Sequence, residues 1–342
     1  MTRTGWHQWL MRRWYGPEPM LLLVPFSWLF MLLTAIRRAG YRFGIFKSTR
    51  LPAPVIVVGN ITVGGTGKTP LVIWLSQALQ ARGYRPGIVT RGYGGKSKHW
   101  PLPVTATTAA ALAGDEAVLL ARATGLPVMA GPDRMQAARQ LLHDQAVNVI
   151  VSDDGLQHYR LGRDLQIVTL DGERGCGNGW RLPAGPLRES TAAIKKADVV
   201  VCKSRLPAGV ELPPHTPVMH MNLLEAVRLR DGLRVPLANF RGRSVHSIAG
   251  IGHPEQFFAL LAAAGIQVEP HPLPDHAALT RRELQFDDQR PVLMTEKDAV
   301  RWAGPDRPNL WYVPAHAEFS RVHAADLMRA VEGCLAVRGA AG

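Results

Sequence analysis

The chain has 342 residues, a hydrophobic fraction of 46%, a charged fraction of 20% and a formal net charge of +13. This composition argues against a disordered chain, and the length is enough for two packed units. Three cysteines, Cys176, Cys202 and Cys334, lie far apart without a C-x-x-C spacing. They indicate a reducing compartment and give no sign of a disulfide framework or a cysteine-bound zinc ion.

The first 50 residues are basic and partly apolar. They carry eight Lys or Arg and one acid, a net charge of +7. Between the arginines runs an uncharged stretch, 20–36, which as a helix would span about 26 Å, just short of a bilayer's hydrocarbon core. Tryptophan and tyrosine side chains surround it, as is typical near lipid headgroups. We therefore expect residues 1–50 to form a helical segment on the membrane surface, without nucleic acid as a partner. A full crossing and a buried core helix are the alternatives.

A glycine-rich turn follows. Residues 55–69 read VIVVGNITVGGTGKT, an apolar strand that runs into a loop and a helix. Glycines let backbone N–H groups crowd around phosphate oxygens, and a helix N-terminus attracts them. Lys68 would reach the β- and γ-phosphates of ATP, and the Thr69 hydroxyl would ligate Mg²⁺. The pattern is a variant, because Thr62 replaces the first glycine of G-x-x-x-x-G-K-[ST]. The predicted ATP-binding residues are Thr62, Val63, Gly64, Gly65, Thr66, Gly67, Lys68 and Thr69.

Strand-like and helix-like segments alternate from here. We expect strands at 55–59, 86–90, 127–130, 147–152, 165–170 and 198–202, and helices at 70–82, 114–124 and 133–145. Asp133 is the expected N-cap of the last helix. Continuous β-branched runs are typical of strands covered on both faces. The alternation predicts an α/β fold of the P-loop NTPase type, a doubly wound and mostly parallel sheet with ligands at its carboxyl edge.

The pattern of predicted elements changes near residue 213. Short strands are expected at 217–221, 245–248, 292–295 and 310–313, with helices at 254–265 and 315–337. We therefore divide the chain into the N-terminal segment 1–50, a nucleotide-binding domain 51–212 and a smaller α/β lobe 213–342. The C-terminal helix is expected to pack back on the nucleotide-binding domain.

Paired carboxylates end one of the predicted strands. Asp153 and Asp154 follow the apolar run 149–151, and a carboxylate at a strand tip beside a phosphate loop commonly holds Mg²⁺. Adjacent residues on a strand point to opposite faces. At most one of the two is therefore expected to be well placed for the ion, and the sequence leaves open which one. A solvated turn is the alternative.

Several other loops carry reactive side chains. Asp115 opens a predicted helix and is either a catalytic carboxylate or an ordinary N-terminal cap. His276 lies in a proline-rich loop, where a surface histidine is the alternative. Loops that contain glycine or proline carry three further candidates for binding an anionic substrate or the nucleotide: Arg91, Arg188 and Glu189. Residues 295–298 read TEKD, for which a surface charge cluster is the favoured interpretation.

Taken in order, these motifs resemble those of the tetraacyldisaccharide 4′-kinases, the lipid A 4′-kinases of Gram-negative bacteria. The matching segments span nearly the whole chain: 59–70, 91–94, 114–116, 153–158, 182–189, 251–252, 275–276 and 295–298. Two positions depart from the family pattern: Ala117 stands where we expect proline, and Leu156 replaces an aromatic residue. Neither carries a proposed catalytic atom.

The resemblance implies transfer of the ATP γ-phosphoryl group to the 4′-hydroxyl of a tetraacylated glucosamine disaccharide 1-phosphate. The product would be lipid IVA, made at the cytoplasmic face of the inner membrane with Mg²⁺. The resemblance also implies that Asp115 and His276 form an acid/base pair acting on the sugar hydroxyl. By our division these two residues lie in different lobes, so closure of the lobes would assemble the site.

Two other classes stay open on the residues alone. One is a membrane-associated ATPase switch or metal-insertion chaperone. The sequence shows no paired Cys or His ligands for metal insertion, and partition ATPases usually carry a lysine where this chain has Val63. The other is a membrane scaffold with an inactive nucleotide site, against which the intact Lys68, Thr69 and aspartate pair argue. An assay with labelled ATP separates these classes by the product that carries the label, either a lipid or free phosphate.

Overall fold

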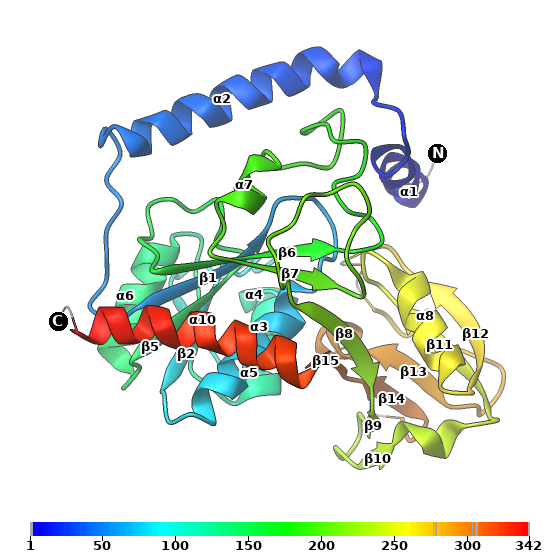
Figure 1. Ribbon diagram of the computed structural model, residues 1–342. Coiled ribbons are helices and arrows are strands. Elements are labelled where there is room, and N and C mark those ends of the chain that lie inside the picture. Colours follow the sequence, from blue (N-terminus) through cyan, green and yellow to red (C-terminus); the bar gives the residue numbers. More distant parts are fainter. Residues whose placement is uncertain (1–2, 276, 278, 303, 305–306, 341–342) are drawn as a thin grey trace.

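The structure is a computed structural model that describes residues 3–275, 277, 279–302, 304 and 307–340 (Figure 1). Two sheets, each with its own helices, make up the body of the molecule, and a pair of N-terminal helices lies outside them. The chain runs through the larger sheet, enters the smaller one and returns to the larger sheet at its C-terminus.

The larger sheet holds nine strands in the order β15-β8-β7-β6-β1-β5-β2-β4-β3. Neighbours from β8 to β4 run parallel, while β15 and β3 are antiparallel edge strands. The strands are β1 (Val55–Asn60), β2 (Pro86–Thr90), β3 (Leu102–Val104), β4 (Val128–Ala130), β5 (Val149–Asp153), β6 (Leu165–Asp171), β7 (Val199–Lys203), β8 (Val218–Leu223) and β15 (Ala315–Phe319). Because β1 lies between β5 and β6, its carboxyl end is central, where loops after parallel strands converge.

Helices cover both faces of this sheet. Every residue of β1 is buried, and alternate side chains enter different cores: Ile56 and Val58 pack with α3 (Lys68–Gln80), α5 (Asp115–Thr124) and α10 (Arg321–Ala340). Val55 and Val57 pack instead with α6 (Arg134–Asp144). The strand period of two explains this division. Two short helices complete the unit, α4 (Ala110–Ala113) and α7 (Ala192–Lys195).

The smaller sheet holds six strands in the order β10-β9-β14-β13-β11-β12. They are β9 (Glu225–Arg228), β10 (Arg234–Pro236), β11 (Ser244–Ala249), β12 (Gln267–Pro272), β13 (Val292–Thr295) and β14 (Leu310–Val313). Helix α8 (Pro254–Ala263) covers one face through Phe257 and Leu261, and a 3-10 turn η2 (Leu237–Phe240) packs there too. Helix α9 (Glu296–Arg301) follows β13 and contacts α5 of the larger unit.

Two expectations about the second half of the chain differ from the structure. The strand predicted at 217–221 is β8, and it belongs to the larger sheet, so the change of sheet falls between β8 and β9 and not at residue 213. The helix predicted at 315–337 begins instead with strand β15, which pairs with β8. Residues Ala317 and Phe319 of β15 pack on the core, a period of two that a helix cannot produce. Helix α10 does pack back on the larger unit through Leu327, Met328, Val331 and Leu335.

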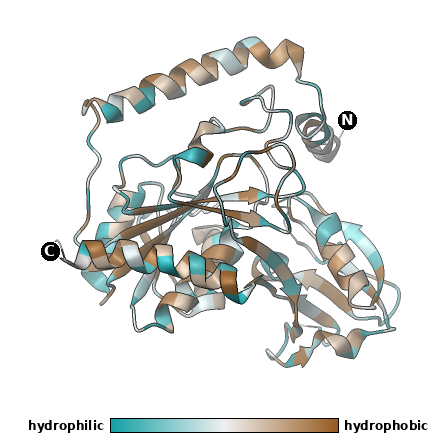
Figure 2. Cartoon of the chain, in the orientation of Figure 1, coloured by the Kyte–Doolittle hydropathy of each residue, from teal (hydrophilic) through white to brown (hydrophobic). Residues whose placement is uncertain are grey.

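The N-terminal segment forms α1 (Arg3–Trp14), a 3-10 turn η1 (Leu21–Leu23) and α2 (Val24–Arg42). Helix α2 runs across the top of the molecule, apart from both sheets (Figure 1). Helix α2 carries the apolar, brown stretches seen in Figure 2. Large apolar side chains of η1 and α2 are exposed: Leu21, Leu22, Phe26, Trp28, Leu29, Leu32, Leu33 and Ile36. The segment Leu21–Arg42 is long and apolar enough to cross a membrane, and only 11% of an 18-residue window within it is buried. The alternative of a buried core helix is therefore wrong.

Polar contacts hold α2 on the loop around residues 181–189. The Ser27 hydroxyl donates to the Arg181 carbonyl (2.9 Å) and accepts from the Ala184 amide (2.9 Å). The Trp14 indole N–H, at the end of α1, donates to the Pro183 carbonyl (2.9 Å). The N-terminal helices are thus anchored to one loop of the larger unit, and that loop also meets the glycine-rich turn after β1.

Candidate active site

The glycine-rich turn after β1 has the shape that phosphate binding requires. Gly64 (φ 115°) and Gly67 (φ 82°) adopt left-handed backbone conformations that favour glycine. A side chain at Gly65 would meet no atom within 4 Å, so the space above the turn is open. Helix α3 begins at Lys68, directly after Gly67, and its N-terminal N–H groups face this open space. The turn can therefore cradle an anion.

Two neighbouring segments hold the turn in place. The Thr66 and Thr169 hydroxyls are hydrogen-bonded at 2.8 Å, which ties the turn to β6. The Val63 amide donates to the Pro186 carbonyl (2.9 Å), and the Arg188 amide donates to the Ile61 carbonyl (2.7 Å). The loop that carries α2 is therefore bonded directly to the phosphate-binding turn.

Lys68 and Asp154 meet beside this turn. The Lys68 ammonium lies 3.5 Å from Asp154 Oδ1, and the Arg188 guanidinium lies 3.2 Å from Oδ2. Burial opposes ionisation of Asp154, but Lys68, Arg188 and Arg134 together keep the pKa of this carboxyl below its usual value. Arg188, a predicted substrate residue, thus contacts Asp154 of the aspartate pair.

Asp153 is the more deeply buried member of the aspartate pair. It is 1% exposed, and its Oδ1 has no hydrogen-bond partner within the described part of the chain. Burial, followed by the charges of Glu116 and Asp154, raises the pKa of Asp153 to about 7. A buried carboxylate without compensation is costly, and a divalent cation would remove that cost. The two carboxyls do not diverge as successive strand residues would, because Asp154 turns into a left-handed conformation (φ 47°); both lie in the field of Lys68.

Asp115 lies at the junction of the two units. It is 6% exposed at the start of α5, and its Oδ2 lies 2.7 Å from the Arg301 guanidinium of α9. Its Oδ1 accepts the Glu116 amide at 2.9 Å. A capping role alone would leave the carboxylate facing solvent. The ion pair with Arg301 instead fixes this carboxylate across the junction.

Lys297 joins the acidic groups around Asp115. Its ammonium lies 3.3 Å from Glu116, 3.6 Å from Asp275 and 4.0 Å from Asp115. Burial opposes its charge, but the three carboxylates together raise the pKa of Lys297. The interpretation of residues 295–298 as a surface charge cluster is therefore wrong. Asp298 is 1% exposed and accepts hydrogen bonds from the Gly250 amide (3.0 Å) and the Thr295 hydroxyl (2.6 Å).

The remaining predicted site residues are His276, Arg91 and Glu189. His276 lies outside the described residues, but its neighbour Asp275 is within reach of Lys297. Arg91 follows β2 and is exposed, and its charge acts on Arg134. Glu189 is 6% exposed and accepts from the Tyr159 hydroxyl (2.6 Å), and it pairs with Arg38 of α2. In this structure Glu189 therefore connects α2 to the body of the molecule.

Sequence reasoning missed several residues beside the turn. The Tyr15 hydroxyl, just after α1, donates to the Val63 carbonyl (2.5 Å), and the Arg174 guanidinium lies 4.8 Å from the Tyr15 ring centre. Arg134 donates to the Asp154 carbonyl (2.8 Å). These are isolated residues far from the glycine-rich motif in the sequence, so no local pattern marked them.

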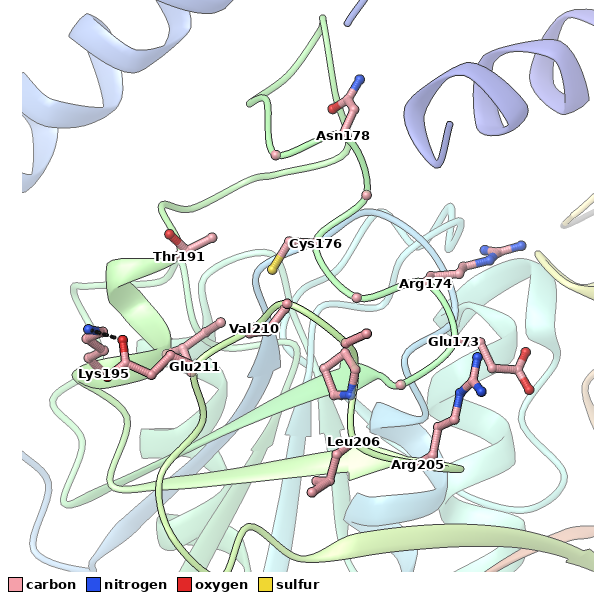
Figure 3. Close-up of a pocket in the computed structure, with 18 of the residues that line it drawn as sticks. Glu173, Arg174, Cys176, Asn178, Thr191, Lys195, Arg205, Leu206, Val210 and Glu211 are labelled. Carbon is pink, nitrogen blue, oxygen red and sulfur yellow. Dashed lines mark hydrogen bonds and ion pairs between the residues drawn. The ribbon is translucent and has the colours of Figure 1, made fainter. Parts of the chain in front are cut away.

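A cavity of about 930 Å³ lies at the carboxyl ends of β6 and β7 (Figure 3). Loop residues 172–179 and 205–211 line it, together with part of α7. Arg174 and Arg205 reach its edge, and Lys195 pairs with Glu211 (2.6 Å) beside it. The cavity does not include the phosphate-binding turn, but Arg174 lies between the two: a side chain at Gly64 would be 3.4 Å from its Nη1.

Comparisons with known proteins agree with this arrangement. The family model described as tetraacyldisaccharide-1-P 4′-kinase (LpxK) matches residues 19–332. This chain belongs to that family. A tetraacyldisaccharide 4′-kinase of Nitrosococcus oceani is 49% identical over 306 residues, 89% of each chain, and that of Methylobacillus flagellatus is 48% identical over 327 residues, 94% of this chain and 95% of the relative.

A solved structure supports the fold as well. LpxK from Aquifex aeolicus in complex with ATP matches with a TM-score of 0.76 and 30% identity, covering 92% of this chain and 98% of that one. The expected α/β fold with a large, mostly parallel sheet is confirmed, and so is the family that the sequence motifs indicated.

Proposed function

We propose that this chain transfers the γ-phosphoryl group of ATP to the 4′-hydroxyl of a tetraacyldisaccharide 1-phosphate in lipid A biosynthesis. The observation that carries the proposal is the placement of Lys68 on one side of the carboxyl edge and Asp115 with Glu116 on the other, with Asp153 interacting with both Lys68 and Glu116. Phosphoryl transfer depends mainly on such positioning and on neutralising charge.

The phosphate-binding turn would hold the β- and γ-phosphates. Backbone N–H groups at 64–69 and the start of α3 would donate to the phosphate oxygens, as the open space above Gly65 allows. Lys68 would exchange its ion pair with Asp154 for the γ-phosphate. The Asp154 carboxylate would keep Arg188, its other partner at 3.2 Å.

The residues present fit a magnesium ion. Asp153 offers a buried oxygen without a hydrogen-bond partner in the described structure, whereas both oxygens of Asp154 are already engaged. We therefore assign Asp153 as the nearer carboxylate, with Thr69 and Asp154 completing the protein's share. When bound, Mg²⁺ would neutralise the phosphate oxygens.

Asp115 would accept the proton of the attacking 4′-hydroxyl. Its Oδ2 is held by Arg301 and its Oδ1 by a backbone amide, so the carboxylate is fixed in orientation before substrate arrives. His276 is proposed as its acid/base partner, and the contact between Asp275 and Lys297 brings the segment that carries it to the same junction.

The direction of the nucleotide follows from the strand order. Asp115 begins the helix that leads into β4, on the β5 side of β1, whereas the 930 Å³ cavity lies on the β6 side. If the γ-phosphate faces Asp115, the nucleoside points toward the cavity. Its volume is in the range of sites for small ligands. We therefore propose that the cavity receives the adenosine of ATP.

Helix α2 would bring the enzyme to its lipid. A substrate with four acyl chains leaves a bilayer at a cost of about 0.8 kcal/mol per buried CH₂, so the reaction has to occur at the membrane. The exposed apolar side chains of α2 would enter the cytoplasmic leaflet, and the basic residues of the first 50 positions would meet the headgroups and the phosphate of the substrate.

Incubation of the purified chain with γ-labelled ATP, Mg²⁺ and tetraacyldisaccharide 1-phosphate in mixed micelles tests the proposal. We expect label in a lipid that carries a second phosphate, and none with Lys68→Ala. Label in free phosphate alone would mean a nucleotide switch, and it would overturn the proposal.

A further inference from the structure

The smaller unit contains a group of metal-ligating side chains far from the phosphate-binding turn. His246 lies on β11, and Glu269 and His271 lie on the adjacent edge strand β12. One candidate ligand atom from each of these residues lies within 4.8 Å of the others. We propose that these three residues form a binding site for a divalent transition metal ion, with Zn²⁺ as the expected occupant.

Strand register brings the three residues together. His246 and Glu269 are direct partners in the parallel pairing of β11 with β12, and His271 is two residues further along β12. Partners in register share a face of the sheet, and residues two apart on one strand do too. All three side chains therefore project from the same face. The 22 residues between His246 and Glu269 hide this pattern from sequence inspection.

The distances between ligand atoms suit a tetrahedral ion. His246 Nδ1 lies 3.0 Å from His271 Nε2, and each lies close to Glu269, at 3.7 Å from Oε2 and 3.8 Å from Oε1 respectively. Metal–ligand bonds of 2.0–2.1 Å at tetrahedral angles would separate ligand atoms by about 3.3 Å. The distance between the two nitrogens is slightly shorter than that value, and the two distances to Glu269, which end on different carboxylate oxygens, are slightly longer. Small side-chain rotations would therefore bring both nitrogens and one carboxylate oxygen around the ion.

A fourth side chain prepares His246 as a ligand. Asp288 lies 3.1 Å from His246 Nε2, and its carboxylate can only accept a hydrogen bond, so Nε2 carries the proton. The lone pair of His246 is then on Nδ1, the nitrogen that faces His271 and Glu269. Metal-bound histidines commonly donate their other N–H to a carboxylate in this way.

The burial of His246 and the net charge of the surrounding side chains also suit a bound cation. His246 is 3% exposed and stacked on Phe286 with ring centres 3.7 Å apart, so its orientation is fixed. Arg290 donates to Glu269 Oε2 (2.7 Å) and to Asp288 (2.6 Å), which leaves Glu269 Oε1 for the metal. With the imidazoles neutral, two carboxylates and one guanidinium give a net charge of −1 that a cation would offset. Glu269 is half-exposed, so solvent can supply the fourth ligand.

A bound ion would restrain a segment that leads to the active site. It would fasten edge strand β12 to β11, and β12 runs directly into Leu273, Pro274 and Asp275. Asp275 contacts Lys297 at the junction of the two units. The site would therefore stabilise the smaller unit near the residues we assign to acid/base chemistry, without contributing an atom to the reaction.

Titration of tag-free, full-length protein with Co²⁺ in millimolar Mg²⁺ tests the proposal. We expect the visible absorption bands of tetrahedral Co²⁺, one ion per chain, and displacement by Zn²⁺. His271→Gln should weaken binding by about 100-fold or more, and Asp288→Asn, which removes the carboxylate that orients His246 and pairs with Arg290, by about 10–100-fold. Glu269→Gln should also weaken it. Both ligand variants are on an edge strand, and thermal melts in a chelator would check that they fold.

His143→Gln is the matched control. His143 is exposed and lies 2.9 Å from Asp144, a histidine–carboxylate pair without a third ligand in the described structure. Its substitution should leave Co²⁺ binding unchanged. Absence of Co²⁺ bands up to about 100 μM metal would overturn the proposal, and so would binding that His271→Gln leaves intact.

Discussion

Asp115 illustrates how a residue's surroundings decide its role. An acidic residue at a helix start is usually a favourable partner of the helix dipole, and the sequence could not separate this role from catalysis. The structure buries the carboxylate at the junction of two units and pairs it with Arg301. A buried ion pair of this kind is costly to assemble, which favours a functional reason for keeping it.

Substitution of Asp115 by Asn tests the base. The amide keeps the size of the side chain but cannot accept the hydroxyl proton, so kcat should fall by about 10²–10⁴-fold with little change in the KM for ATP. Because the change also weakens the pair with Arg301, a thermal melt and ATP binding should accompany the kinetics. Near-normal turnover by a folded variant would contradict the assignment.

Substitution of Asp153 should change stability and activity in opposite directions. Its folded pKa, about 7, is above that of an unfolded aspartate, so the stability linked to its protonation is full at low pH and is lost as pH rises through about 4 to 7. Asp153→Asn should therefore raise the free energy of unfolding at pH 8 by more than about 1 kcal/mol and flatten its dependence over this range, while it abolishes activity. Denaturant unfolding of the metal-free protein at pH 4 and 8 would measure this, and an unchanged pH dependence would contradict it.

Tyr15 connects the N-terminal segment to the phosphate-binding turn. Tyr15→Phe removes the hydroxyl that donates to the Val63 carbonyl and keeps the ring that packs with Arg174. A single hydrogen bond is worth about 0.5–1.5 kcal/mol, so ATP should bind about 2–10-fold more weakly in a calorimetric titration. Tyr84→Phe is the control. Tyr84 packs against the hydrophobic core to which α3 contributes, and this variant should bind ATP normally. Equal affinities for both variants would show that the turn does not depend on α1.

At the scale of elements, α2 is unusual because its apolar side chains face outward. Helices of a globular protein normally turn their apolar stripe to the core, yet the buried residues of α2 are Val24, Ser27 and Gly40. Ser27 bonds to the loop below, and Gly40 leaves room for the Phe46 ring, to which a side chain there would come within 2.6 Å. An exposed apolar surface of this size points to a membrane or a partner protein.

Leu33→Glu tests the membrane surface. Leu33 is 57% exposed, so a charge there should not alter the free energy of unfolding, but it should reduce binding to anionic vesicles by at least about 10-fold, since burying a leucine is worth about 1.5–3 kcal/mol. Val337→Glu on α10, where Val337 is 74% exposed, is the control and should sediment with vesicles like the unmodified chain. Equal loss in both variants would mean that net charge alone, rather than α2, governs attachment.

In the whole molecule, the residues of the proposed site come from two units. The larger sheet supplies the phosphate-binding turn, the aspartate pair and Asp115, and the smaller unit supplies Lys297, Arg301 and the segment with Asp275. Gly252 of the smaller unit also approaches the turn: a side chain there would lie 4.0 Å from the Gly65 amide. Nucleotide and acceptor would thus be enclosed between the two units.

A double-mutant cycle between Glu116 and Lys297 measures this connection. Lys297→Met should lower kcat by about 10-fold or more while the Kd for ATP changes less, because the lysine acts across the junction. Glu116→Gln removes its partner at 3.3 Å, and the two changes should be non-additive in the free energy of unfolding by about 1 kcal/mol. Strict additivity would mean that the two units dock independently of this pair.

Elements whose signals are local can be read from the amino-acid sequence. A phosphate-binding turn, β-branched strands and the Asp133 N-cap, which accepts from the Met135 and Gln136 amides, are encoded in consecutive residues. The ordered motifs identified the family in the same way. The exposed apolar run of α2 was also legible, since hydropathy is a property of the segment alone.

Contacts between residues that are distant in the chain become visible only once it has folded. The partners of Asp115 lie 182 and 186 residues away, at Lys297 and Arg301, and no spacing rule links them. Strand β15 was mistaken for the start of a helix because its pairing partner β8 is remote in the chain. Residues 295–298 resemble a surface cluster because charged residues are usually exposed to solvent. Here the contact between the two units buries them. Short-range patterns report backbone preference, whereas burial and pairing depend on how separate segments pack.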